Sequence, residues 1–227
     1  MKKVISFSLW GNIPNYTVGA IRNAELAKET FPGWICRYYV DENSVPKDVL
    51  DKLMSFDNTE VIHVGKGDWT GMFWRFYACA DSEVDVMLSR DVDSRVSERD
   101  SIAVNEWLAS DKSFHIIRDH PHHHYKILGG LWGVRNNRLR GMKQLISQWN
   151  KQNRKQTDQW FLAQIIYPKI RNDCFVHDVF YCYEGQRRKI NKSRVNFEHL
   201  GEYIDENENQ SQPHCQALKQ WLKGRDL

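Results

Sequence analysis

Two aspartates one residue apart, Asp91 and Asp93, follow an apolar stretch in "VDVMLSRDVDSR", residues 84–95. Alternate residues of an extended chain point to the same side, so both carboxylates are expected to project together where the strand ends. Two like charges at one place favour a cation, and hard oxygen ligands suit Mn²⁺ or Mg²⁺, with water and substrate phosphate oxygens completing the coordination. The alternative is an exposed strand-to-turn junction, where aspartate is common.

The composition predicts one packed domain. A chain of 227 residues suits a single α/β domain, and a hydrophobic content of 41% with 12% aromatic residues argues against disorder. The net charge of +3 falls short of a nucleic-acid-binding surface, so no nucleic-acid partner is expected. Composition does not determine the oligomeric state.

The cysteines and the apolar segments indicate a cytoplasmic location. The five cysteines are widely separated and form no CxxC pair, which predicts neither a disulfide framework nor a zinc site. Gly11 and Asn12 interrupt the N-terminal apolar run before it reaches the form of a signal peptide. No stretch approaches the length needed to span a bilayer, so no integral membrane segment is expected.

The elements that must position Asp91 and Asp93 alternate along the first half of the chain. Strands are expected at 3–10, 34–40, 60–64 and 84–89, and helices at 18–31, 46–55, 72–80 and 98–109. This order predicts a mostly parallel sheet with helices on both faces, whose ligands bind at the carboxyl ends of the strands. The second half predicts strands at 114–118 and 173–181, a Gly-rich segment at 129–134, helices at 138–149 and 157–166, and a terminal helix at 215–223.

A strand ending in DxD after about ninety residues of alternating β and α structure resembles the nucleotide-sugar-dependent glycosyltransferases of the GT-A fold. The segments "SFSLWGN", "MFWRFYACAD", "GGLWGVR", "TDQWFL" and "VHD" occur in the order that this fold uses, over about residues 4–180. In particular, the chain is similar to small stand-alone transferases of large DNA viruses and bacteria that decorate surface glycans.

The resemblance implies an α/β, single-domain GT-A (Rossmann-like) fold, with a mostly parallel central sheet flanked by helices and a small C-terminal helical extension. The domain would span 1–200, with a nucleotide-binding part at about 1–95 and an acceptor-binding part at about 96–200. Residues 201–227 would form a polar linker and the C-terminal helix.

For the donor side, the resemblance implies that Asp91 and Asp93 hold Mn²⁺ or Mg²⁺ on a diphosphate, and that His177 completes the metal site. A lone histidine in an apolar run is otherwise a hydrogen-bonded core residue. Donor-binding positions are expected in the loop after the first strand, after the second strand and at basic residues: Leu9, Gly11, Asn12, Asp41, Arg75, Arg90, Asp91, Arg187 and Lys189.

Several of these positions have a structural alternative. Asn12 and Asp41 are equally well explained as residues that cap turns. Arg75 lies on an otherwise apolar helix, where it could form an ion pair with Asp81 or Asp85 instead of contacting phosphates. Basic runs such as 187–189 are mostly solvated.

For catalysis, the resemblance implies that Asp158 in "QTDQWFLAQ" is the base of an inverting reaction. Asp158 would begin an amphipathic helix with Thr157 as its N-cap, and a helix start lowers the basicity of a carboxylate. The alternative is an aspartate that only stabilises the helix start. Asp119 is the second candidate base.

On the acceptor side, the loop "RDHPHHHYK" is expected to be mobile and to place His122 near the acceptor. Three consecutive histidines rarely converge on zinc. Gly129 and Gly130 would let the backbone approach a sugar, and Trp132 would stack on one.

Together these residues predict an enzyme that moves a sugar from a nucleoside-diphosphate donor, first UDP and next GDP, to a glycan or other hydroxyl acceptor by a single displacement. A noncatalytic module that binds nucleotide or glycan is the main alternative. A DxD phosphotransferase ranks lower, because such enzymes carry the motif on the first strand and three strands precede it here.

Overall fold

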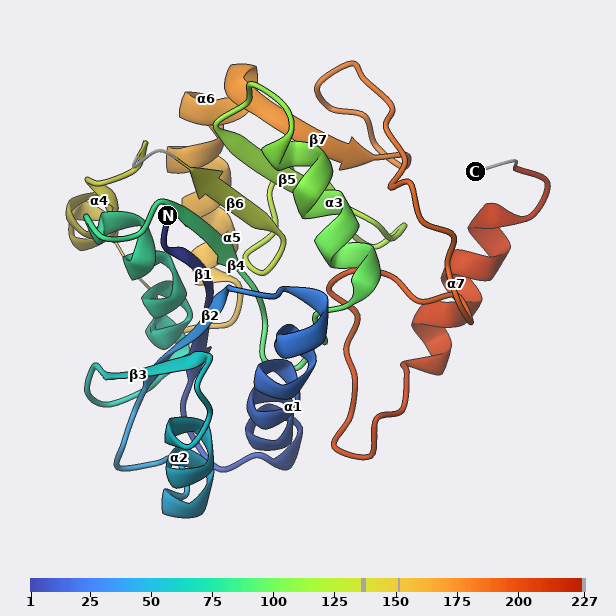
Figure 1. Ribbon diagram of the computed structural model, residues 1–227. Helices are drawn as coiled ribbons and strands as arrows, with labels where there is room; N and C mark the ends of the chain where they lie inside the picture. Colours follow the sequence, from blue (N-terminus) through green and yellow to red (C-terminus); the bar gives the residue numbers. More distant parts are fainter. Residues whose placement is uncertain (136–137, 151, 226–227) are drawn as a thin grey trace.

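The computed structural model describes residues 1–135, 138–150 and 152–225, and a seven-stranded sheet runs through its centre (Figure 1). The strands are β1 (Lys3–Leu9), β2 (Ile35–Val40), β3 (Thr59–His63), β4 (Val86–Ser89), β5 (Phe114–Arg118), β6 (Trp132–Arg135) and β7 (Cys174–Asp178). Their order is β3-β2-β1-β4-β6-β5-β7. Of the strands in the described residues, β6 alone runs antiparallel to its neighbours, which confirms the mostly parallel sheet.

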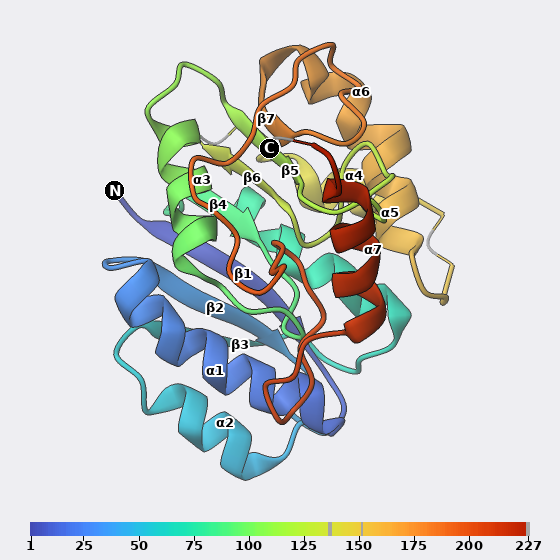
Figure 2. The ribbon, with the colours of Figure 1, turned by 90° about the vertical axis from the view of Figure 1, so that its right-hand side faces the viewer.

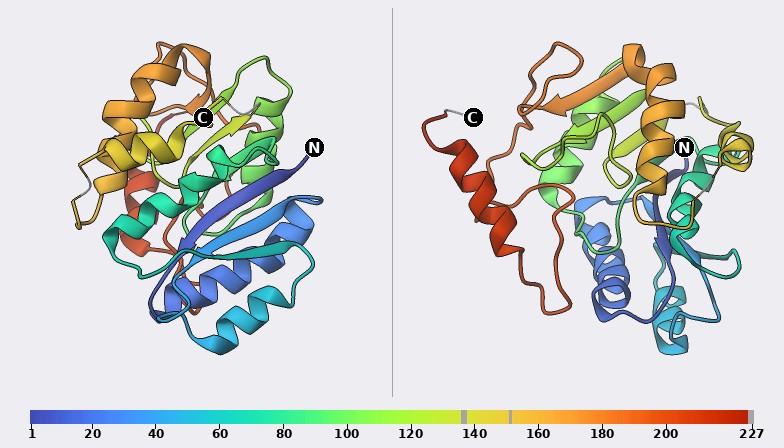
Figure 3. Two further views of the ribbon diagram at one scale, coloured as in Figure 1. Left: turned by 90° about the vertical axis from the view of Figure 1, so that its left-hand side faces the viewer. Right: turned by 180° about the vertical axis from the view of Figure 1, so that it is seen from behind.

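Helices cover both faces of the sheet, as expected (Figures 2 and 3). One face carries α1 (Pro14–Thr30), α2 (Lys47–Met54) and α3 (Glu98–Leu108). The other carries the 3₁₀ helix η1 (Trp69–Ala80), α4 (Met142–Gln148), α5 (Thr157–Phe161), the π-helical turn η2 (Leu162–Ile166) and α6 (Tyr167–Ile170). The short η3 (Arg171–Asp173) precedes β7, and α7 (Gln212–Leu222) lies at one side of the molecule.

Small residues let α1 lie close to the sheet. Its buried positions include Ala20, Ala24 and Ala27, which pack in the same core as Ile5 and Phe7 of β1. The alternation along β1 therefore directs these two apolar side chains to α1. The central strands β1 and β4 are buried on both faces, and the polar residues that they carry, Ser6, Ser8 and Ser89, are small and buried as well.

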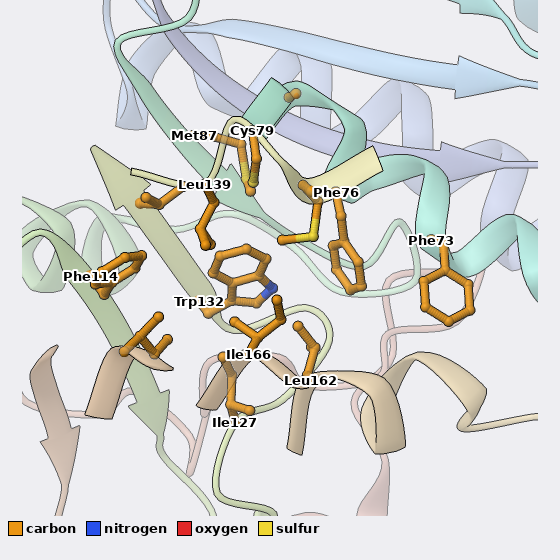
Figure 4. Packing of buried hydrophobic residues seen from close by; sticks show 14 of the residues in the cluster. Phe73, Phe76, Cys79, Met87, Phe114, Ile127, Trp132, Leu139, Leu162 and Ile166 are labelled. Atoms are coloured by element: carbon orange, nitrogen blue, oxygen red, sulfur yellow. The ribbon is translucent and has the colours of Figure 1, made fainter. Parts of the chain in front are cut away.

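Trp132 of β6 is fully buried in the core on the opposite face, at the centre of the cluster in Figure 4. Phe76 of η1 meets it edge-on, with ring centroids 5.5 Å apart, and Leu139 and Ile166 lie beside it. The expectation that Trp132 stacks on a sugar is wrong, because β6 turns this side chain into the core and leaves no face of the ring exposed.

Most predicted elements are present with shifted ends. The strand predicted at 114–118 has those bounds, whereas the helix predicted from residue 18 already begins at Pro14, a residue that fits the first helical position. The helix predicted at 72–80 is a 3₁₀ helix that starts at Trp69, where the Asp68 side chain accepts a hydrogen bond from the Thr70 N–H. No helix among the described residues combines the length and apolar character that crossing a bilayer requires.

Candidate active site

Asp91 and Asp93 follow β4 at the carboxyl edge of the sheet, and both line one cavity of about 420 Å³. The sequence predicted a common direction from the alternation of an extended chain, whereas the structure places the two acids in a turn, where the Ser94 N–H donates to the Asp91 carbonyl at 3.3 Å. Within the described residues Asp93 makes no ion pair, and its pKa is raised to about 6, first by burial and then by the charge of Asp91. The folded chain therefore leaves a repulsion between the acids that a bound cation would relieve.

The walls of this cavity combine aromatic and charged side chains. Leu9, Trp10 and Gly11 come from the end of β1 and the loop after it, and Trp69 from the start of η1. Further lining residues are Ser8, Ile13, Tyr16, Met72, Arg75, Asp91, Val92, Asp93, Lys155, Gly201 and Tyr203. The volume lies in the range of small-molecule sites.

Arg75 joins two acids that lie far apart in the sequence. Its buried guanidinium forms an ion pair with Asp91 and another with Asp158, the latter at 2.6 Å between Nη2 and Oδ2. The partners proposed from the sequence, Asp81 and Asp85, instead contact Arg37 and the Lys2 N–H. The Arg75 Nε–H is buried without a hydrogen-bond acceptor in the described chain, so this group retains an unused donor.

Asp158 lines a second hollow of about 170 Å³, which shares Arg75, Asp91 and Lys155 with the larger cavity. Thr157 is the first residue of α5 rather than its N-cap, since the cap position falls on Gln156 in a left-handed conformation. The pKa of Asp158 is raised, first by burial, although Arg75 opposes this shift. The Gln159 N–H at the helix start lowers this pKa, in the direction expected, but burial outweighs it.

Gly129 and Gly130 let the backbone pass against this network of charges. A methyl group on Gly130 would overlap the Asp91 carboxylate, and one on Gly129 would overlap Arg75 and Asp158. The sequence predicted that the backbone here approaches a sugar, and the structure shows it close to the two acids and their arginine.

The loop residues expected to hold the nucleoside divide into two groups. Leu9 and Gly11 line the larger cavity, and Gly11 adopts a φ of 75°, which favours glycine. Asn12 is exposed and lies outside the cavity lining. Asp41 is buried in a turn, where it accepts hydrogen bonds from Ser44 Oγ at 2.7 Å and the Gly67 N–H at 2.9 Å. This is the turn-capping alternative for Asp41.

Arg90 points away from the paired acids. Its guanidinium is buried and forms a double hydrogen bond with Asp100 of α3, with Nε and Nη2 at 2.8 and 2.7 Å from the two carboxylate oxygens. Because these donors are already used, Arg90 fixes the start of α3 against β4, and the structure does not bring it to the cavity.

Asp119 and His177 are also held away from Asp91 and Asp93. Asp119 is buried between Arg99 and Arg194, and although burial opposes it, these two guanidinium groups lower its pKa, which weakens it as a base. His177 lies between His115 and Glu106, at 2.9 and 2.7 Å. In the part of the chain that the structure describes, no three histidine, cysteine or acidic residues are arranged to hold a metal ion, so the predicted set of Asp91, Asp93 and His177 does not converge.

Three further expected residues lie elsewhere. His122 is exposed, while its neighbour His123 lines the smaller hollow. Arg187 is exposed, and Lys189 lines a separate cavity near the end of β7. Neither of these two cations is among the residues that line the cavity of the paired acids.

Sequence reasoning missed several residues of the two hollows. Lys155 lines both, and it stands in a polar loop without a recognisable pattern. Tyr203 lies in the tract expected to be a linker, where the Ile204 N–H donates to the Asp93 carbonyl at 2.8 Å. An aromatic residue inside an otherwise polar tract was the available signal for Tyr203.

No family model matches the sequence, and no curated protein matches it either. Solved structures do match its fold. A glycosyltransferase involved in glycosylation of the major capsid of PBCV-1 is 20% identical, with a TM-score of 0.51 over 78% of this chain and 82% of that one. The galactosyltransferase LgtC, solved with donor and acceptor sugar analogues, is 13% identical, with a TM-score of 0.51 over 77% and 73%.

A nucleotidyltransferase also matches. The 4-diphosphocytidyl-2C-methyl-D-erythritol synthase of Anaerococcus prevotii is 12% identical, with a TM-score of 0.50 over 98% of this chain and 96% of that one. At these identities a likeness establishes the architecture alone. The strand order, the helices on both faces and the solved glycosyltransferases that share them give this chain the GT-A type of α/β fold.

Proposed function

We propose that the protein is a glycosyltransferase that moves a sugar from a nucleoside diphosphate to a hydroxyl group of a glycan or another acceptor. One observation carries this proposal: Arg75 holds Asp91 and Asp158 together at the boundary between two adjoining hollows. One hollow has the size and aromatic walls for a nucleotide, and the other contains a buried acid. The similar solved glycosyltransferases support the same class.

The donor would lie in the larger cavity, with its base against Trp10 or Trp69 and its diphosphate at the paired acids. Asp91 and Asp93 suit Mn²⁺ or Mg²⁺, because both offer carboxylate oxygens and the negative charge of Asp93 forms no ion pair among the described residues. When bound, the cation would stabilise the negative charge of the departing diphosphate. UDP is the first donor nucleotide to test and GDP the second.

Asp158 would take the proton of the acceptor hydroxyl in an inverting displacement. Its raised pKa makes it a better base than an ordinary aspartate, and its hollow adjoins the donor cavity. Arg75 would orient Asp158 through their ion pair and offer its free Nε–H to an oxygen of the donor. Lys155 lies at the rim shared by both hollows and adds positive charge there.

Nucleotidyl transfer is a second candidate, favoured by the fold likeness that extends over nearly the whole chain. The products distinguish the two reactions, since sugar transfer or slow hydrolysis of a nucleotide-sugar releases a nucleoside diphosphate and nucleotidyl transfer releases pyrophosphate. A noncatalytic binding module would release neither.

The test is a screen of UDP- and GDP-sugars with Mn²⁺ for release of nucleoside diphosphate. We expect release with the wild type and with Asp111→Asn, an exposed control, and a loss of at least about 100-fold in Asp93→Asn. Asp158→Asn should keep nucleotide binding and lose transfer by about 10²–10⁴-fold. Transfer retained by Asp158→Asn would mean that another group is the base or that the configuration is retained. Pyrophosphate released from a nucleoside triphosphate, in a parallel assay with a sugar phosphate, would replace the proposal.

A further inference from the structure

A third cavity, of about 50 Å³, lies beside the ends of β5 and β7 and shares no lining residue with the cavity of the paired acids. Since β6 is antiparallel to both β4 and β5, the carboxyl ends of β4, β5 and β7 lie at one edge of the sheet. The two cavities therefore occupy different positions along the same edge.

Cations dominate the walls of this cavity. Six line it: Arg99, Arg118, Arg188, Lys189, Lys192 and Arg194. The lining carboxylates are Asp119 and Asp178, and each is already engaged by arginine. Asp119 forms ion pairs with both Arg99 and Arg194. The six cations therefore outnumber the carboxylates that line the cavity.

Two of the cations keep unused donors. Arg188 stacks on Phe175, with its guanidinium carbon 3.8 Å from the ring centroid, and gives one Nη1–H to the Val176 carbonyl at 3.3 Å. Lys189 is exposed, and neither residue has a carboxylate partner among the described residues. Lys192, by contrast, is paired with Glu98 at 2.7 Å.

We propose that this cavity binds a small tetrahedral oxyanion, phosphate or sulfate, either free or as the terminal group of a monoester. Arg188 and Lys189 would supply charge-assisted hydrogen bonds from one side, and the Arg99–Asp119–Arg194 group would add a positive field from the other. The volume exceeds that of a single bound water and suits a compact anion rather than a nucleotide. The inference is independent of the proposed transferase activity.

An anion bound at this site would also restrain a segment that lines the donor cavity. Arg194 contacts Asp119, the Leu200 N–H donates to the same carboxylate at 3.0 Å, and Gly201 and Tyr203 then line the larger cavity. The segment from 187 to 204 thus connects this cationic cavity to the larger cavity of the paired acids. Its course from β7 toward α7 is visible in Figure 2. An anion bound at its beginning would restrain the part that contacts nucleotide.

The experiment measures the melting temperature of the full chain, without metal or nucleotide, in sodium phosphate against sodium chloride of equal ionic strength. We expect a saturable rise in phosphate and also in sulfate, retained by Arg187→Gln, an exposed neighbour outside the cavity lining. Lys189→Gln should weaken the apparent affinity by about tenfold or more, as the loss of a hydrogen bond between charged groups predicts. Glycerol 2-phosphate shows whether a monoester is accepted.

Phosphate also stabilises proteins nonspecifically, but that effect does not saturate and would be equal in all variants. An equal rise in wild type and Lys189→Gln would therefore overturn the inference. A second arm repeats the titration with Mn²⁺ and UDP present, where the phosphate shift is expected to persist and the combined shift to be at least the sum of the two. Abolition of the phosphate shift by nucleotide would instead assign these cations to the donor site and would overturn the separate anion site.

Discussion

Asp93 carries a charge that the folded chain does not neutralise. Its pKa is raised to about 6 by burial and by Asp91, whereas an unfolded aspartate titrates near its ordinary value of about 4. Between these two values the folded state binds more protons than the unfolded state. Without a cation, the free energy of unfolding is therefore expected to fall as the pH rises from about 4 to 6, and the full penalty is present above pH 6.

Asp93→Asn should accordingly stabilise the metal-free protein at pH 7.5, by about 1–2 kcal/mol after allowance for solvent screening, and have little effect near pH 4. Urea unfolding at the two pH values measures this difference. The same variant should lose the rise in melting temperature that Mn²⁺ with UDP gives the wild type. Destabilisation of Asp93→Asn at pH 7.5 would show that the carboxylate already has a partner.

Arg75 is the complementary case, a cation on which two acids depend. Arg75→Met leaves Asp158 buried without a partner, which is expected to cost about 3–5 kcal/mol in the free energy of unfolding. Adding Asp158→Asn removes that unpaired charge, so the double variant should recover part of the loss in a double-mutant cycle. Strictly additive effects in urea unfolding would contradict the ion pair.

At the scale of elements, the loop between β5 and β6 must pass over the paired acids with no side chain between. Gly130→Ala places a methyl group against the Asp91 carboxylate and is expected to cost about 1–3 kcal/mol and to weaken nucleotide binding. Gly141→Ala is the matched control, because nothing lies within 4 Å of its added methyl group and its φ is −74°. Thermal unfolding and a nucleotide titration of both variants test the difference.

The pattern of apolar residues predicted where the strands and helices lie better than it predicted the type of helix or the side that a residue faces. The strand at 114–118 and the helices over 46–55 and 98–109 follow from periodicity and turn residues, and they are present with small shifts. The same periodicity cannot distinguish an α-helix from the 3₁₀ helix of Trp69–Ala80, because both bury similarly spaced apolar residues. Nor could it reveal that Trp132 faces the core, since the helices that pack on the sheet, η1 and η2 among them, decide what covers this side of β6.

At the scale of the whole molecule, the sequence pattern identified Asp91 and Asp93 as site residues, but only the tertiary structure shows which side chains surround them. The pair of acids was visible in the sequence, but Asp91 and Asp93 share one cavity because the chain turns after β4, not because it stays extended. The meeting of Arg75 with Asp158 joins positions 83 residues apart and depends on how η1 and α5 pack on the sheet. For the same reason the separation of His177 and Lys189 from the acids could not be inferred from sequence order.

The five histidines at 120, 122, 123, 199 and 214 join three distant segments, the loop after β5, the segment before Gly201 and the start of α7. His120 stacks on His199, with centroids 4.2 Å apart, and also contacts His214 at 5.4 Å. Burial lowers the pKa of His120 to about 4, of His123 to about 3 and of His199 to about 2. Neighbouring histidines disfavour protonation of His120, His123 and His199, Arg194 adds to this at His120 and His123, and Asp119 opposes it in part at His123 and His199.

Because the unfolded state binds these protons near pH 6.5 and the folded state does not, the stability contributed by the cluster is complete above pH 6.5 and is lost as the pH falls. At pH 5 each fully buried histidine costs at most about 2 kcal/mol, a trend opposite to that of Asp93. We expect α7 to detach first, since His214 holds its start, and limited proteolysis at pH 5 should cut within 202–212. His199→Gln should flatten the acid dependence of the melting temperature, whereas His63→Gln, an exposed control on β3, should leave it unchanged; equal slopes in both variants would remove the cluster as its cause.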